Sequence, residues 1–93
     1  MSKHYINEIG AVIIVDTNMN LSRATKVLLQ IKKPLGTTIN WTGSVYNKTF
    51  IRYVVKRGDL NEAGRYLLQA YVEMPGYSGR GDSTDFTIYN VFE

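Results

Sequence analysis

The stretch that most constrains the fold is residues 58–73, which read GDLNEAGRYLLQAYVE. Its first seven residues are rich in Gly, Asp and Asn, which predicts a turn. Over residues 65–73 apolar and polar side chains then alternate, which predicts a strand with Tyr66 on its buried face. Glu62, Gly64 and Tyr66 at alternate positions are typical of a tyrosine corner, whose hydroxyl bonds the backbone of the preceding turn. The alternative is a core tyrosine that follows an ordinary turn.

The rest of the chain also reads as short strands separated by turns. No window shows sustained helical spacing, and turn-forming segments recur about every 8–12 residues, as they do in sandwich folds. We therefore predict an all-β protein, a single immunoglobulin-like antiparallel β-sandwich of about seven strands. Trp41 is expected to lie over the partner sheet, or else to be an ordinary buried tryptophan. The expected strands are residues 9–16, 25–33, 37–42, 44–46, 49–56, 65–73 and 84–92.

A chain of 93 residues is expected to form one domain. We assign residues 9–93 to the sandwich and residues 1–8 to a flexible N-terminal arm. The first strand, residues 9–16, is apolar on both faces. This pattern indicates either that both faces of the strand are covered or that the strand is used as a contact edge. The first ten residues lack the apolar core of a signal peptide, and the sequence has no Cys. These features favour a protein that is assembled inside the cell.

The sequence predicts no catalytic, cofactor-binding or metal site, and hence not an enzyme. Its eight acidic residues are scattered, and its one histidine, His4, lies on the expected arm with no carboxylate at a fixed spacing. Without Cys, a thiolate metal site is excluded. The net charge of +3 is spread along the chain, which disfavours a nucleic-acid partner. The longest apolar run, residues 11–15, is too short to cross a membrane.

The most specific short motif is Arg80-Gly81-Asp82. We expect it in a long flexible hairpin loop, residues 74–83, which contains Pro75 and three glycines. Arg-Gly-Asp on a loop is an integrin-recognition motif, and a nearby exposed Tyr77 suits contact with a sugar. The alternative is a glycine-rich loop that needs small and polar residues for its geometry. The candidate contact residues are Tyr77, Arg80, Gly81 and Asp82.

A second candidate site is an apolar and aromatic patch on the outward face of one sheet. Such patches mark interfaces when their strands are neighbours, and tyrosines are frequent in contact surfaces. The alternative is scattered exposed apolar side chains, which are common. The candidate interface residues are Leu28, Leu67, Tyr71, Tyr89 and Val91.

Several segments in succession resemble a known family. They are residues 14–17 (IVDT), 20–25 (NLSRAT), 27–36 (VLLQIKKPLG), 58–64 (GDLNEAG) and 68–73 (LQAYVE). Together they are similar to small structural proteins of tailed bacteriophages that have an immunoglobulin-like domain, and more distantly to the N-terminal domain of phage baseplate upper proteins. The resemblance covers nearly the whole chain.

The resemblance implies a non-enzymatic virion component, assembled in the bacterial cytoplasm and located in the virion. It would act as a capsid decoration, connector, or tail or baseplate accessory that docks on other virion proteins. It would be a homo-oligomer or be present in many copies per particle, with loops that contact a host surface. The alternative function is an adhesion or sugar-binding module that acts through the Arg80-Gly81-Asp82 loop.

Overall fold

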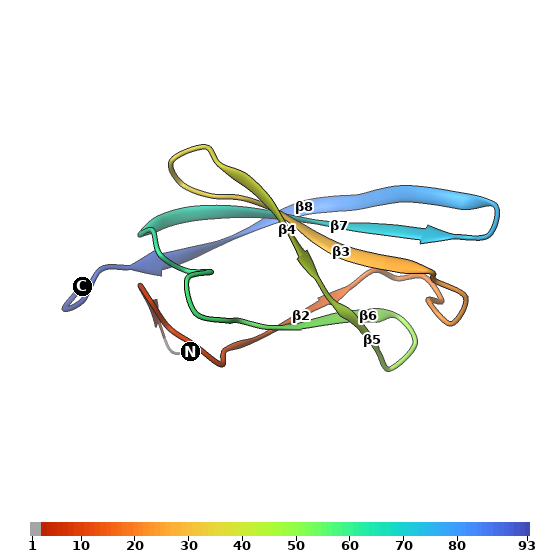
Figure 1. Cartoon of the computed structure of the whole chain (residues 1–93), viewed down its shortest axis with the longest axis horizontal. Helices are drawn as coiled ribbons and strands as arrows, with labels where there is room; N and C mark the ends of the chain where they lie inside the picture. Colours follow the sequence, from red (N-terminus) through yellow and green to blue (C-terminus); the bar gives the residue numbers. More distant parts are fainter. Residues whose placement is uncertain (1–2) are drawn as a thin grey trace.

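The computed structural model describes residues 3–93 as two β-sheets with no helix in that range (Figure 1). In chain order, the strands are β1 (His4–Tyr5), β2 (Val12–Asp16), β3 (Lys26–Lys32), β4 (Thr38–Thr42), β5 (Ser44–Tyr46), β6 (Phe50–Val54), β7 (Gly64–Met74) and β8 (Tyr77–Tyr89). The all-β prediction is therefore confirmed, with eight strands instead of about seven.

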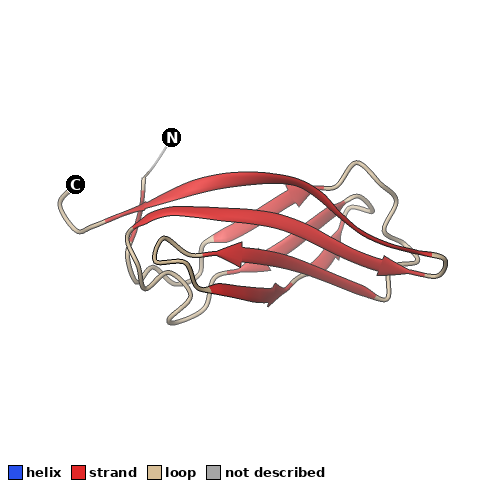
Figure 2. Ribbon diagram, turned by 90° about the horizontal axis from the view of Figure 1, so that it is seen from above, coloured by secondary structure: helices blue, strands red, loops and turns tan. Residues whose placement is uncertain are grey.

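The strands divide into a larger and a smaller sheet. The five-stranded sheet has the order β1-β8-β7-β3-β4, and the three-stranded sheet has the order β2-β6-β5. The pairs are antiparallel except for β1 and β8, which run parallel. In Figures 1 and 2 the two sheets lie as separate layers, and the long β7–β8 hairpin reaches beyond the shorter strands.

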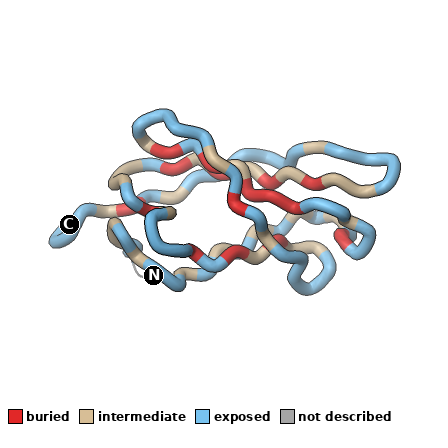
Figure 3. Tube along the Cα trace, in the orientation of Figure 1, coloured by how far each residue is buried: buried red, intermediate tan, exposed pale blue. Residues whose placement is uncertain are grey.

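The core lies between the two sheets and is formed by inward-facing residues of their strands. Figure 3 shows the buried positions along the chain. In the larger sheet, β3 and β7 contribute most of the inward side chains, and β6 is the main contributor in the smaller sheet. Trp41 of β4 stacks on Tyr53 of β6, with ring centroids 4.7 Å apart. Because these strands belong to different sheets, the prediction that Trp41 lies over the partner sheet is confirmed.

The chain passes from one sheet to the other at Gly43. This residue separates β4 of the larger sheet from β5 of the smaller one. A Cβ atom at this position would lie 2.5 Å from Cγ2 of Ile51 and 3.2 Å from the carbonyl oxygen of Arg52. The crossing is therefore so close to β6 that a side chain at this position would force Ile51 to move.

The predicted tyrosine corner is present at the start of β7. The Tyr66 hydroxyl donates to the carbonyl oxygen of Glu62 at 2.7 Å and accepts from its N–H at 3.2 Å. The ring is fully buried and stacks on Phe86 of β8 at a centroid distance of 5.1 Å. Gly64, which lies between Glu62 and Tyr66 in the chain, has φ +129°, and a Cβ atom at this position would lie 2.9 Å from Pro34. The turn before β7 is thus packed against the turn between β3 and β4.

The prediction of a flexible loop over residues 74–83 is wrong. Only Pro75 and Gly76 lie between β7 and β8, and Met74 pairs directly with Tyr77. Pro at the second position and Gly with positive φ at the third match the requirements of a tight turn. Residues 77–83 then continue as the first half of β8, because the long strand β7 offers them backbone partners over its whole length.

The N-terminal arm also differs from the expectation. Residues 1–2 of the predicted arm lie outside the described residues. His4–Tyr5 form β1, and the N–H groups of Ile6 and Asn7 donate to the carbonyl oxygens of Tyr89 and Leu60 at 2.9 and 2.7 Å. This part of the arm is therefore held against the end of β8 by backbone hydrogen bonds. The apolar pattern of residues 9–16 extended the predicted first strand too far, since β2 begins only at Val12.

Candidate interaction surfaces

The Arg80-Gly81-Asp82 motif lies in the middle of β8, not at a loop tip. Tyr71 pairs with Arg80 and Gln69 with Ser83, so that Gly81 and Asp82 together lie opposite the single residue Ala70. Two residues opposite one form a β-bulge, which bends the strand and interrupts its ladder. The motif is thus part of a hydrogen-bonded sheet and does not have the exposed loop setting that its functional interpretation requires.

Arg80 is further held by side chains of the sheet. Its Nε donates to Oε1 of Gln30 on β3 at 2.7 Å, and its guanidinium lies 5.1 Å from the ring centroid of Tyr71. The Tyr71 hydroxyl donates to Glu73 at 2.6 Å, and this bond raises the pKa of Tyr71. Arg80 therefore lies across β7 and reaches β3. Tyr77, the fourth predicted contact residue, follows the turn and is exposed.

The predicted interface residues do not form one patch. Leu28 and Tyr71 pair directly on the outer face of the larger sheet, and Leu67 lies four residues before Tyr71 on β7. Leu28 is only 7% exposed and offers little surface to a partner. Tyr89 is at the other end of β8, where its ring lies 6.3 Å from that of Tyr5, and Val91 follows the end of the strand. The structure thus brings together only Leu28 and Tyr71, and Leu67 shares their face further along β7.

A more exposed apolar surface covers the smaller sheet. We call it the apolar face, and it consists of the outward side chains Val12, Ile14, Tyr46, Phe50 and Val54. Val12, Ile14 and Val54 are 47%, 48% and 38% exposed. Of the two interpretations of the first strand, cover on both sides is not provided by residues 3–93, which leave these side chains exposed. The apolar pattern of that strand was the only sequence feature that indicated this surface.

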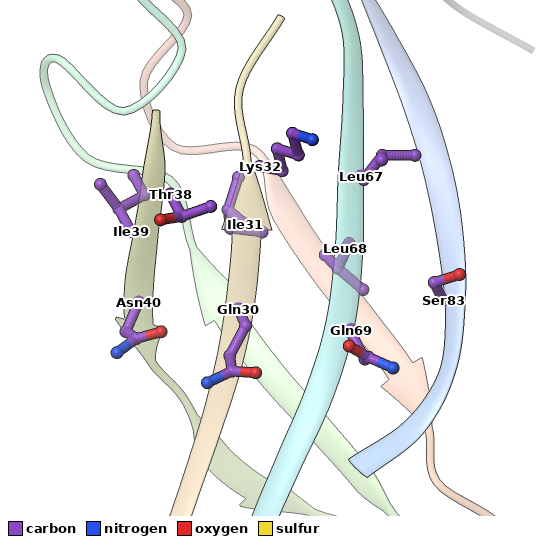
Figure 4. A pocket seen from close by; sticks show the side chains of 10 residues that line it. All are labelled: Gln30, Ile31, Lys32, Thr38, Ile39, Asn40, Leu67, Leu68, Gln69 and Ser83. Atoms are coloured by element: carbon purple, nitrogen blue, oxygen red, sulfur yellow. The ribbon is translucent and has the colours of Figure 1, made fainter. Parts of the chain in front are cut away.

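The outer face of the larger sheet contains a hollow of about 480 Å³ (Figure 4). Four polar residues cross it in one row, and each lies on a different strand. Gln30 pairs with Asn40 on one side and Gln69 on the other, and Gln69 pairs with Ser83. We call Asn40, Gln30, Gln69 and Ser83 the amide row. No motif in the sequence indicates this row, because three amides and one serine on four separate strands form no continuous pattern.

Two ionisable pairs lie near the ends of the sheets. The Tyr53 hydroxyl donates to Asp59 at 2.5 Å, and burial followed by this bond raises the pKa of Tyr53. Nδ1 of His4 lies 2.9 Å from Oε1 of Glu8, and this contact lowers the pKa of Glu8. His4 thus has a carboxylate partner four residues away, contrary to expectation, because the turn after β1 brings Glu8 back to it. Both His4 and Glu8 remain partly open to solvent.

Within residues 3–93, the structure brings no three His, Cys, Asp or Glu side chains together in a way that would hold a metal ion. Over the same range, no helix has the length and apolar character required to span a membrane.

Comparison with known proteins gave no relative. The chain matches no protein-family model, no curated protein and no solved structure at the significance required.

Proposed function

We propose that this protein is a non-enzymatic structural component of a tailed-bacteriophage particle and that it docks on neighbouring virion proteins through the apolar face. The apolar face is the observation that carries the proposal. Three β-branched side chains that are each more than a third exposed lie together on a sheet of only three strands. Apolar surface of this kind is removed from water at protein interfaces, with a gain of about 25 cal/mol per Å².

The position of β2 adds a second means of contact. Among the described strands β2 pairs only with β6, so the opposite side of its backbone is an open edge next to Val12 and Ile14. A partner strand that added to this edge would form backbone hydrogen bonds while its side chains extended the apolar contact. Arg52, which pairs with Ile14 on the same face, supplies one charge that restricts the choice of partner.

The strand order supports an immunoglobulin-like assignment for the two sheets. In such folds one sheet contains strands G, F and C in adjacent positions and the other contains B, E and D. Here β8, β7 and β3 are adjacent in one sheet, and β2, β6 and β5 form the other. The tyrosine corner at the start of β7 is at the position expected for strand F. The resemblance to phage structural proteins, which covers nearly the whole chain, supports the same lineage.

Adhesion through Arg80, Gly81 and Asp82 ranks second. The bulge leaves Asp82 exposed, but Arg80 is bonded to Gln30 and the motif is within a strand. An integrin-type contact would need Arg80 to leave both Gln30 and Tyr71.

The first test is mass spectrometry with copy-number counting on purified particles of the phage that encodes the protein. We expect many copies in a simple ratio to a major capsid or tail protein.

The second test adds purified protein to particles that lack it. Ile14→Lys is expected to abolish binding, and Thr42→Lys, an exposed strand position on the other sheet, is the matched control. Absence from particles, or equal binding of both variants, would refute the proposal.

A further inference from the structure

The amide row is a neutral polar surface that the proposed docking function does not use. It lies on the five-stranded sheet, whereas the apolar face lies on the three-stranded sheet. Neighbouring strands are about 4.8 Å apart, so four adjacent strands place the row over about 14 Å. An amide group donates and accepts hydrogen bonds without any charge. The row therefore presents a line of uncharged donors and acceptors across the sheet.

Two amides of the row are oriented by contacts within the protein. Gln30 accepts from Arg80 through Oε1 at 2.7 Å, and Gln69 donates through Nε2 to the carbonyl oxygen of Gly81 at 2.9 Å. Each contact engages one end of the amide. The other ends, the NH₂ of Gln30 and the carbonyl oxygen of Gln69, have no hydrogen-bond partner within residues 3–93, nor has the side chain of Asn40. A free donor and a free acceptor are thus held on adjacent strands.

The arrangement matches the chemistry of a hydroxyl group. One hydroxyl located between the two strands would accept from Gln30 and donate to Gln69. Figure 4 shows Asn40, Gln30 and Gln69 side by side on three adjacent strands. Leu67, two residues before Gln69 on β7, is an apolar residue that lines the same hollow. The hollow of about 480 Å³ is within the range of about 300–1,000 Å³ that is usual for small-molecule sites.

We propose that the amide row binds a neutral saccharide chain, whose successive hydroxyls bond to Gln30, Gln69 and Asn40. The charges around the row favour this ligand class over nucleic acid. A phosphate backbone requires several free cations, whereas Arg80 is bonded to Gln30, and Arg65 forms an ion pair with Asp85 at 2.5 Å. Of the residues that line the hollow, Lys32 alone is charged.

The test is electrophoresis of the native protein through gels that contain hydroxyethylcellulose, laminarin or soluble starch. We expect at least one polysaccharide to retard the protein. The double variant Gln30→Ala/Gln69→Ala should weaken this binding at least about tenfold, because it removes two hydrogen bonds. Asn90→Ala, an exposed amide after the end of β8, is the matched control and should bind like the unmodified protein. Equal retardation of the double variant, or none in any of the gels, would overturn the proposal.

A second measurement needs no variant. In ¹H–¹⁵N spectra of the ¹⁵N-labelled protein, the side-chain NH₂ signals of Gln30, Gln69 and Asn40 are observed directly. Addition of cellohexaose, laminarihexaose or maltohexaose should shift these signals first. Shifts confined to residues 77–82 would overturn the proposal and would favour adhesion through the hairpin. Because both experiments use the isolated protein, their outcome is separate from that of particle docking.

Discussion

Removal of one hydroxyl, in the variant Tyr66→Phe, tests whether the tyrosine corner stabilises the fold. The hydroxyl makes two hydrogen bonds with the backbone of Glu62, as donor at 2.7 Å and as acceptor at 3.2 Å. A hydrogen bond contributes about 0.5–1.5 kcal/mol net, and an unsatisfied buried group costs about 1–3 kcal/mol. Since the ring itself is retained on Phe86, we expect the free energy of unfolding to fall by about 2 kcal/mol.

The expected change is large enough to measure in a domain of this size. The entropy of unfolding is about 2.1 cal/mol/K per residue, so 93 residues give about 0.2 kcal/mol/K. A loss of about 2 kcal/mol therefore lowers the melting temperature by about 10 °C. Urea unfolding followed by the fluorescence of Trp41 is a suitable assay, because this ring is buried against Tyr53.

The control is Tyr46→Phe, which removes a hydroxyl from a ring that is 49% exposed on β5. We expect this variant to differ from the unmodified protein by less than about 0.5 kcal/mol. The reasoning would be refuted if Tyr66→Phe were equally neutral, or if both variants lost the same stability. A change in the slope of the urea dependence would instead indicate an altered unfolded or native state.

Three further predictions concern the sheet crossing and the two ionisable pairs. Gly43→Ala should lower the free energy of unfolding by about 1–3 kcal/mol, because the added Cβ would overlap Ile51 of β6. Gly81→Ala is the control and should be near neutral, because a Cβ at that position meets open space. Equal urea midpoints of the two variants would contradict this prediction. Burial and the bond to Asp59 raise the pKa of Tyr53 on folding, so its contribution to stability is complete below its unfolded pKa of about 10 and is lost as the pH rises. Tyr53→Phe should therefore make the fall in urea midpoint between about pH 9 and 11 shallower, and an unchanged fall would be evidence against a raised pKa of Tyr53 in the folded protein. Folding lowers the pKa of Glu8 from its ordinary value of 4.5, so its contribution to the stability of the fold is present above that pH and is lost as the pH falls. In a carbon NMR titration, the pKa of Glu8 should move back towards 4.5 in the variant His4→Ala. Identical titrations of the variant and the unmodified protein would exclude the contact between His4 and Glu8.

Several features of this protein could be predicted from local sequence because they depend on residues close together in the chain. The tyrosine corner joins two residues four positions apart. The turn before β7 could be predicted from its Gly, Asp and Asn residues, of which Gly64 has a positive φ. The alternating pattern of residues 65–73 likewise predicted the inward face of β7, since alternate side chains of a strand share one face. The short strand β5 was predicted with its observed bounds.

Other features were decided by the tertiary structure, because they depend on what lies beside each strand. Residues 77–83 have the glycines and polar side chains of a loop, yet they are a strand because β7 is long enough to pair with them. Periodicity shows which residues share a face but not whether that face is covered, so Leu28 was expected to be exposed and is buried. The amide row exists only through the registers of three strand pairs, which bring residues 30, 40, 69 and 83 into one line. Register is set by turns and by core packing over the whole sheet, and no single segment of the sequence contains it.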